Sequence, residues 1–359
     1  MKNYFKNKTV LVTGHTGFKG SWLISWLNQL GANVIGIALD PPTKISHFTE
    51  AKMANDITDL RIDIRDFSTL EKAIVKAQPD FVFHLAAQAL VRLSYVSPID
   101  TWQTNVLGTL NMLEALRKLK KPCVAVLITS DKCYDNVEWV WGYRENDAMG
   151  GSDPYSASKG AAELVIRSHI KSFFPKGQTQ VHIASARAGN VIGGGDWAAD
   201  RIIPDCVKAW SQKQIALLRN PHSTRPWQHV LEPLCGYLTL AIALVENPKL
   251  HGESFNFGPP SHQTQSVLNL VQQMARYWDQ VRWQEAINDN TGPYESGLLK
   301  LNCDKALHYL KWQAALNFEE TVHLTVDWYK SYYEKPELIA SVTRDQIKKY
   351  IKLSKISFD

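Results

Sequence analysis

The first half of the chain alternates short apolar runs with segments of helical periodicity. Runs rich in β-branched and aromatic residues lie at 9–13, 34–39, 60–63, 81–85, 124–129 and 181–186. Between them, apolar residues recur three or four positions apart, as from Trp22 to Leu30 and from Pro98 to Leu119. Apolar strands separated by helices predict a parallel sheet that is covered on both faces. We therefore expect an α/β fold with a Rossmann-type, doubly wound parallel sheet.

The pattern changes after about Ala188, where glycines and prolines interrupt shorter elements. We expect residues 1–188 to form the Rossmann domain, although later segments are free to return to it. Residues 189–335 are then mainly a smaller, C-terminal substrate-binding domain, and residues 336–359 a tail. The apolar stretch 234–245 is too short to span a bilayer and predicts a buried helix.

Composition narrows the class of protein. The 45% hydrophobic content is ample for a core, and the net charge of +5 is spread along the chain. No basic tract suggests nucleic acid as a partner, although an anionic substrate is compatible with the charge. The five cysteines are unclustered, which argues against disulfides and against a metal site. No apolar signal region or membrane span is evident, so we expect a soluble, cytoplasmic protein without a membrane partner.

A glycine-rich turn follows the first strand. Gly14, Gly17 and Gly20 have the spacing G-x-x-G-x-x-G and precede an amphipathic helix, which suits a pyrophosphate. Asp40 ends the second strand, where a carboxylate accepts hydrogen bonds from ribose hydroxyls and favours NAD over NADP. The alternative for Asp40 is a turn residue before two prolines. Asp63 is either a contact to adenine or an ordinary cap.

Tyr155 and Lys159 are four residues apart at the start of a predicted helix, so both lie on one face. A neighbouring ammonium favours the phenolate form of a tyrosine, which can then take a proton from a sugar hydroxyl. Together with the glycine turn, His84–Ala87 and Thr104–Thr109, this pair resembles the extended short-chain dehydrogenase/reductase family. The resemblance covers nearly the whole chain to about Tyr329. The cofactor contacts that it implies are Gly14, Gly17, Phe18, Lys19, Gly20, Asp40, Asp63, Ile64, Leu85, Ala86, Ala87, Thr104, Tyr155, Lys159 and Val191.

The segment Thr129–Tyr134, at the end of the fifth strand, resembles the acid/base segment of the nucleotide-sugar 4,6-dehydratases. Those enzymes usually carry Asp-Glu, and Asp131-Lys132 in its place resembles the branch that acts on CDP-glucose. Residues 187–197 and 225–230 resemble that branch as well. The resemblance implies that Tyr155 is the C4 base, Lys132 the C5 base and Asp131 the C6 acid, while Ser130 orients the C4 hydroxyl. The alternative is a solvated ion pair between Asp131 and Lys132.

The resemblance also implies the substrate and its contacts. Arginine suits a diphosphate because its guanidinium binds two oxygens at once. The expected substrate-binding residues are Gln88, Ser130, Asn190, Arg201, Arg225 and Asn256. For each, the alternative is a role in stabilising a loop. Physical reasoning alone supports a nucleoside-diphosphate sugar, and CDP-glucose enters through the resemblance, as does deoxysugar synthesis for surface polysaccharide such as the O-antigen of lipopolysaccharide.

Three other functions stay open: another nucleotide-sugar dehydratase, a 4-epimerase, and a non-catalytic NAD sensor. Epimerases need no C5 base or C6 acid, and a sensor has no use for Tyr155 with Lys159. The resemblance further implies a homo-oligomer, a dimer or a dimer of dimers, that pairs through helices at about 98–119 and 155–174. Candidate interface positions are Leu110, Leu113, Leu116 and Val165, although these residues could instead face the sheet.

Overall fold

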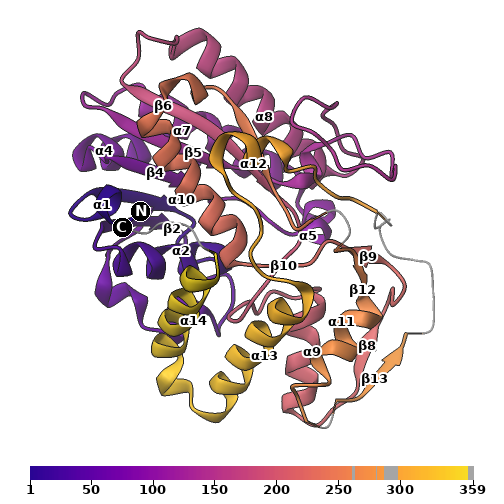
Figure 1. Ribbon diagram of the computed structural model, residues 1–359. Coiled ribbons are helices and arrows are strands. Elements are labelled where there is room, and N and C mark those ends of the chain that lie inside the picture. Colours follow the sequence, from indigo (N-terminus) through magenta and orange to yellow (C-terminus); the bar gives the residue numbers. More distant parts are fainter. Residues whose placement is uncertain (261–262, 280, 287–297, 355–359) are drawn as a thin grey trace.

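The fold is built on one parallel sheet. The computed structural model describes residues 1–260, 263–279, 281–286 and 298–354. Within these residues, seven strands pair in parallel, in the order β11 (Ser254–Phe257), β6 (Val181–Ala188), β5 (Cys123–Ile128), β4 (Phe81–His84), β1 (Thr9–Thr13), β2 (Asn33–Ala38) and β3 (Thr58–Arg61). The order reverses between β1 and β4, so the predicted doubly wound Rossmann-type fold is confirmed (Figure 1).

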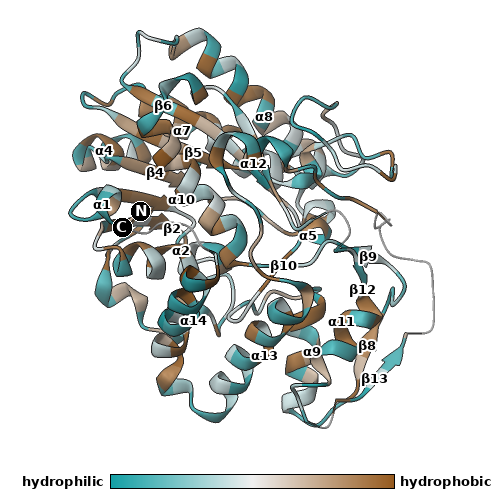
Figure 2. Cartoon of the chain, in the orientation of Figure 1, coloured by the Kyte–Doolittle hydropathy of each residue, from teal (hydrophilic) through white to brown (hydrophobic). Residues whose placement is uncertain are grey.

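Alternate side chains of each strand enter the hydrophobic cores on opposite faces of the sheet. In β1, Val10 and Val12 enter one core and Leu11 the other. Helices α2 (Phe18–Gln29) and α10 (Leu231–Glu246) cover the first face. The second face is covered by α4 (Phe67–Ala77), α7 (Gly108–Leu116) and α8 (Pro154–Phe173). Figure 2 shows the central strands as hydrophobic, as expected for a sheet buried on both faces.

Three elements differ from the sequence-based expectation. The third strand begins earlier than predicted, at Thr58. The long helix from Pro98 is divided into α6 (Pro98–Trp102), a π-helix η2 (Gln103–Leu107) and α7. Strand β11, which extends the sheet beyond β6, was not among the predicted strands. The apolar stretch 234–245 lies in α10, as expected.

A smaller region lies below the sheet in Figure 1 and holds short elements from the second half of the chain. It contains β7 (Val191–Ile192), α9 (Ile202–Ser211), β8 (Ala216–Leu218), β9 (Thr224–Arg225), β10 (Gln228–His229), β12 (Gln265–Ser266), α11 (Val267–Met274), β13 (Trp283–Glu285) and α13 (Phe318–Glu334). Helix α14 (Ile339–Leu353) follows and packs against α2. The boundaries proposed between domains stay predictions.

Shorter segments complete the description. They are α1 (Lys2–Phe5), α3 (His47–Glu50), η1 (Met53–Asp56), α5 (Val91–Val96), η3 (Asp131–Cys133), η4 (Pro248–Leu250), α12 (Asp304–Leu310) and η5 (Pro336–Leu338). In the part of the chain that is described, no helix is both long enough and apolar enough to cross a membrane.

Candidate active site

The glycine turn lies against the carboxyl end of the neighbouring strand β4. Gly14 has a φ of +74°, and an added Cβ would stand 2.8 Å from the backbone nitrogen of Ala86. At Gly20, a Cβ would clash with the carbonyl oxygen of Gly14. Gly17 is the N-cap of α2, so the unpaired amides of the first helical turn lie beside this glycine cradle. A backbone cradle at a helix N-terminus fits the pyrophosphate of a dinucleotide.

The carboxylates predicted for the adenosine side of the cofactor have different surroundings. The Asp40 side chain is 90% exposed, and its Oδ1 lies 3.5 Å from Arg61 Nε. Asp63 is held by Arg65, whose Nη2 donates to Oδ2 at 2.7 Å. This hydrogen bond lowers the pKa of Asp63. Ile64 is buried against Gly108. Asp40 is therefore open to a ribose, whereas Asp63 has an arginine partner within its own loop.

The segment after β4 is fixed by side-chain amides. The Gln88 side chain donates to Thr101 Oγ1 at 2.9 Å and to the carbonyl of Leu90 at 3.0 Å. Asn105 Nδ2 bridges the carbonyl of Gln88, at 3.1 Å, and Ser158 Oγ on α8, at 2.9 Å. Residues 85–87 and 104 are half-buried beside this bridge. A sugar contact by Gln88, which stays a prediction, would have to compete with these local hydrogen bonds.

Tyr155 and Lys159 lie together near the start of α8. Asp153 caps the helix by accepting a hydrogen bond from the amide of Ser156 at 2.9 Å. Lys159 Nζ lies 5.9 Å from the centroid of the Tyr155 ring, and the two residues are only 5% and 8% exposed. Burial raises the pKa of Tyr155 to about 12, although a hydrogen bond with Ser130 opposes this. Burial lowers the pKa of Lys159 to about 8. An ammonium beside a phenol favours the phenolate form, which is the role predicted for this pair.

The turn after β5 brings Asp131 into the same site. Ser130 Oγ donates to Asp131 Oδ1 at 2.9 Å, and it accepts from the amide of Lys132 at 3.3 Å. Asp131 is 3% exposed, and burial raises its pKa against the attraction of Lys132 and Lys19. Burial also lowers the pKa of Lys19 to about 8. Asp131 is thus not solvated, and it is protonated more easily than a free carboxyl group.

Among the predicted substrate residues, Arg201 is the one whose charge acts on Tyr155. Its guanidinium acts electrostatically on Tyr155, and its Nη1 donates to Asp196 Oδ2 at 2.6 Å. Tyr329, on α13, holds Asp196 in turn by donating to its carbonyl at 2.5 Å and accepting from its amide at 3.1 Å. A helix distant in sequence therefore positions this arginine.

The other substrate residues are more dispersed. Asn190 lies just before β7 and is half-buried, and Val191 begins that strand. Arg225 lies on β9, where its Nη1 donates to the carbonyl of Thr224. Asn256 is fully buried in β11, and its amide group bonds Tyr134 Oη and the carbonyls of Tyr143 and Asn302. The structure thus gives Asn256 internal partners, and its contact with substrate stays a prediction.

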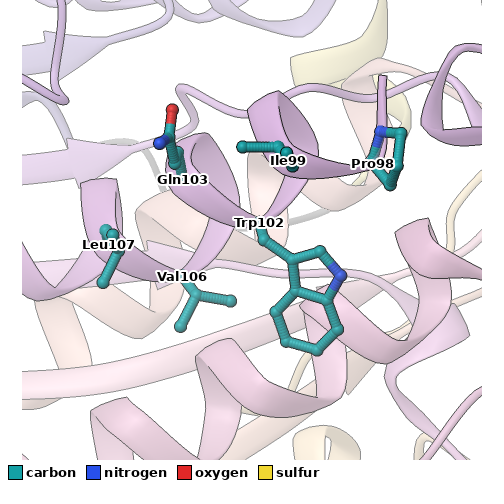
Figure 3. Close-up of a pocket in the computed structure, with 6 residues that line it drawn as sticks. All are labelled: Pro98, Ile99, Trp102, Gln103, Val106 and Leu107. Atoms are coloured by element: carbon teal, nitrogen blue, oxygen red, sulfur yellow. The ribbon is translucent and has the colours of Figure 1, made fainter. Parts of the chain in front are cut away.

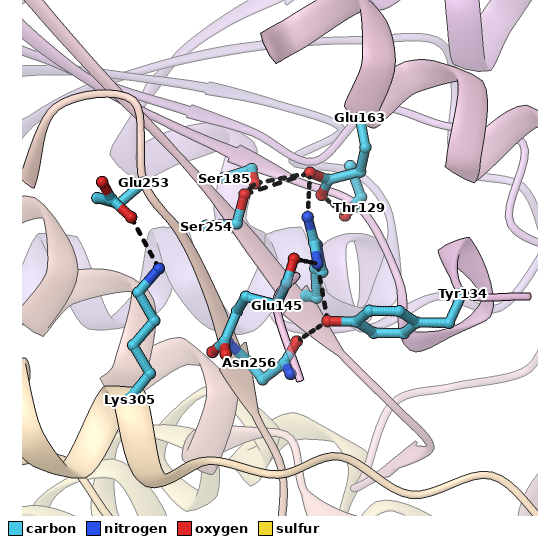
Figure 4. A network of polar contacts seen from close by, with 10 residues as sticks. Thr129, Tyr134, Glu145, Glu163, Ser185, Glu253, Ser254, Asn256 and Lys305 are labelled. Atoms are coloured by element: carbon cyan, nitrogen blue, oxygen red, sulfur yellow. Dashed lines mark hydrogen bonds and ion pairs between the residues drawn. The ribbon is translucent and has the colours of Figure 1, made fainter. Parts of the chain in front are cut away.

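Two buried charges next to the site were not identified from the sequence. Glu163 on α8 and Arg187 on β6 form an ion pair of 2.8 Å between Oε2 and Nη2 (Figure 4). The spacing Tyr155, Lys159, Glu163 was a usable signal, because residues four apart share a helix face. Arg187 was a second signal, because an arginine within a buried strand needs a partner. No group of three or more potential metal ligands occurs among His, Cys, Asp and Glu in the described ranges.

An apolar pocket of about 410 Å³ has none of the predicted site residues in its lining. Its lining comes from α6 and η2 and includes Ile99, Trp102 and Leu107, which are exposed (Figure 3). Two of the candidate interface positions, Leu113 and Leu116, are instead fully buried in the core beneath the sheet. For these two residues the interface role is wrong and the alternative is confirmed, because one face of α7 covers the sheet. Leu110 and Val165 are half-buried.

Comparison with known proteins identifies the family. Residues 11–325 match the family described as GDP-mannose 4,6 dehydratase. The chain belongs to this family. It is 47% identical to the CDP-glucose 4,6-dehydratase of Salmonella typhimurium, over 96% of each chain. It is 26% identical to the dTDP-glucose 4,6-dehydratase of Haemophilus influenzae, over 89% of this chain and 97% of that one. The resemblance to nucleotide-sugar 4,6-dehydratases, and to the branch acting on CDP-glucose, is thus confirmed.

Solved structures agree with the fold expected for this 4,6-dehydratase family. The epimerase Mth375 of Methanothermobacter thermautotrophicus is similar with a TM-score of 0.77 and 22% identity, over 93% of this chain and 96% of that one. The dTDP-glucose 4,6-dehydratase of Bacillus anthracis, solved in complex with NAD, has a TM-score of 0.72 and 21% identity, over 91% and 98%. NAD binding thus occurs among structures with this fold.

Proposed function

We propose that the chain is a nucleotide-sugar 4,6-dehydratase that converts CDP-D-glucose into CDP-4-dehydro-6-deoxy-D-glucose. The 47% identity with the Salmonella typhimurium dehydratase over 96% of both chains supports this substrate. The structural observation that supports the reaction is the buried Asp131, which lies beside Ser130 and Tyr155 at the end of β5. A 4-epimerase would need Tyr155 but not an added acid and base.

NAD is the cofactor that the site fits best. The glycine cradle at Gly14 and Gly20 would hold its pyrophosphate against the N-terminus of α2, and Asp40 would accept hydrogen bonds from the adenosine ribose. The nicotinamide, when bound, supplies a hydride acceptor for C4 and later a hydride donor for C6. All proton transfers fall to side chains of the protein.

The first step is oxidation at C4. Tyr155, as phenolate, takes the proton of the C4 hydroxyl, and Ser130 orients that hydroxyl. Because burial raises the pKa of Tyr155 to about 12, the phenolate needs nearby positive charge. The Lys159 ammonium, 5.9 Å from the ring centroid, supplies it, and Arg201 acts in the same direction.

The second step is loss of water across C5 and C6. A ketone at C4 acidifies the C5 proton, which Lys132 removes, while Asp131 protonates the departing C6 hydroxyl. Burial raises the pKa of Asp131, which suits a group that must carry a proton before it donates one. Lys132 must be neutral to act as a base. The 4-keto-5,6-ene left by this elimination would accept hydride at C6 and a proton at C5 from the protonated Lys132, so the cycle would have no net redox change.

Arginines supply the diphosphate contacts in this proposal. Arg201, held by Asp196, and Arg225 would bind phosphate oxygens, with Asn190 beside them. The carboxyl ends of the parallel strands would then bind the glucose, and the smaller region would bind the nucleoside diphosphate.

The proposal includes assembly into a homo-oligomer. Ile99, Trp102 and Leu107 form an exposed apolar face on α6 and η2, and α8, which packs beside them, exposes Leu164. Apolar faces of this kind mark contact surfaces in soluble proteins. Pairing of these helices between two copies of the chain would bury the exposed apolar side chains.

The 4-keto-6-deoxy sugar formed by the reaction would serve deoxysugar synthesis for surface polysaccharide.

The experiment that tests the function is incubation of the purified protein with NAD and CDP-glucose, with UDP-, dTDP- and GDP-glucose in parallel. We expect a 4-keto-6-deoxy sugar from CDP-glucose and little from the others. A preferred reaction with another nucleotide would correct the substrate. A C4 epimer would assign the protein to the epimerases, and NAD binding without turnover would indicate a sensor.

A further inference from the structure

Glu163, labelled in Figure 4, forms an ion pair with Arg187 and accepts hydrogen bonds from Thr129 and Ser185. The two charged side chains are 2% and 1% exposed, and Oε2 and Nη2 are 2.8 Å apart. Removing two charges from water is costly, and apolar residues of similar volume often stabilise a core as well as a buried ion pair does. Stability alone is therefore a weak explanation for the pair, and its hydrogen-bond partners point to another role.

The ion pair contacts both residues that flank the turn 130–133, which carries the proposed acid and base. Thr129, the residue before Ser130, donates from Oγ1 to Glu163 Oε1 at 2.5 Å. Tyr134, the residue after η3, accepts at its hydroxyl from Arg187 Nη1 at 2.7 Å. The segment between these two contacts contains Asp131 and Lys132. Each end of the acid/base segment is thus bonded to one member of the same ion pair.

The same pair is fixed to the catalytic helix and to the sheet. Glu163 lies one helical turn beyond Lys159 and two beyond Tyr155 on α8. Its Oε2 also accepts from Ser185 Oγ on β6 at 2.9 Å. The Tyr134 hydroxyl, in turn, donates to Asn256 Oδ1 on β11 at 2.7 Å. The network therefore joins the helix that carries the C4 base to the turn that carries the elimination groups.

We infer that Glu163 and Arg187 are positioning residues, which hold Asp131 and Lys132 in register with Tyr155 through Thr129 and Tyr134. This inference rests on the proposed dehydratase reaction. One sugar ring must meet the C4 base and the C5 and C6 groups in a single binding pose. A misplacement of about 1 Å costs on the order of 100-fold in rate, so two separate elements need a rigid connection.

The test uses variants that remove one hydroxyl without leaving a buried charge unpaired. Thr129→Val and Tyr134→Phe should each lower kcat for CDP-glucose by about 10- to 100-fold, with KM within about twofold of wild type. Thr129→Ser keeps the hydroxyl and should restore the rate. Thr325→Val is the matched control, because Thr325 is also buried but donates to the carbonyl of Thr321 within α13. This control should leave kcat unchanged.

A single-turnover measurement separates positioning from a general loss of folding. In Thr129→Val, exchange of the C5 hydrogen with deuterated water should slow by the same factor as kcat. Oxidation at C4 should slow less, because Tyr155 on α8 keeps its place and only Ser130 moves with the turn. A structural role alone would lower the melting temperature and the active fraction, and would slow neither step relative to the other. Equal slowing of both steps would overturn the inference.

A crystal structure of the Thr129→Val/Tyr134→Phe variant gives a test that needs no substrate. Residues 130–133 should be displaced relative to α8 or poorly ordered, compared with a wild-type crystal. A turn that has not moved would overturn the positioning role. If the wild type makes no 4-keto sugar, the proposed function fails, but this comparison still decides the inference. If product forms normally in both single variants, the inference alone fails.

Discussion

Replacing Lys159 by methionine should stabilise the folded protein at neutral pH while removing its activity. The lysine is 5% exposed, and burial lowers its pKa from 10.5 to about 8. Each pKa unit is equivalent to about 1.4 kcal/mol, so the buried ammonium costs on the order of 3 kcal/mol of folding free energy. Methionine fills similar space without a charge, so Lys159→Met should recover much of this cost.

The stabilisation expected from Lys159→Met depends on pH. The unfolded chain holds the proton more tightly than the folded protein does, so protonation of Lys159 favours unfolding. The penalty is fully present below about pH 8 and fades as the pH rises towards 10.5, where the lysine is neutral in both states. The gain in stability from Lys159→Met should therefore be large at pH 7 and small at pH 10.

The assay is urea denaturation of wild type, Lys159→Met and Lys171→Met at pH 7 and pH 10. Lys171 is exposed near the end of the same helix, so its replacement should change stability by less than about 0.5 kcal/mol at either pH. All three proteins are compared without cofactor, because bound NAD would stabilise the native state. A Lys159→Met protein that is less stable at pH 7, or equally stabilised at both values, would refute the reasoning. Its kcat should fall by about 10²–10⁴-fold, because the charge that supports the phenolate is lost.

Three other predictions address the chemistry, the cofactor and the assembly. The Lys132→Met variant should still oxidise C4, but its C5 exchange should slow by about 10²–10⁴-fold, and exchange at the wild-type rate in the folded variant would assign the C5 base to another residue. The Asp131→Asn variant should lose the C6 hydroxyl more slowly, while C5 exchange persists. Asp40→Asn should reduce the ratio of NADP to NAD dissociation constants, and equal wild-type affinity for the two cofactors would contradict the role given to Asp40. Trp102→Glu should convert an oligomer to a monomer in light scattering, and a monomeric wild type would remove that interface.

Much of the fold followed from the sequence because the sheet is buried on both faces. Strands such as β1 and β5 are apolar at successive positions, and such runs are a strong local signal. Strand β11 gave a weaker one. It is four residues long and carries Asn256, whose burial is possible only because Tyr134 and two carbonyl groups, distant in sequence, satisfy its amide. Partners of this kind cannot be identified from local composition.

The sequence predicted where the site residues lie along the chain, but not which side chains hold them in place. Gly14, Ser130 and Tyr155 each follow or begin a recognisable element, and parallel strands bring such residues to one edge. The contacts of Glu163 and Arg187 depend on which side chains meet beneath that edge, as does the support of Arg201 by Tyr329 through Asp196. Leu113 and Leu116 were wrongly expected at an interface for a related reason: helical spacing identifies an apolar face of α7 but not what covers it.

The most direct test of the proposed function follows one hydrogen atom through the reaction. CDP-glucose labelled with deuterium at C4 is incubated with the protein and NAD, and the product is examined by NMR. The account predicts a 4-keto-6-deoxy sugar that carries the label at C6, with no stoichiometric accumulation of reduced cofactor. Label that appears in free reduced cofactor, or that returns to C4 of an epimerised sugar, would contradict it.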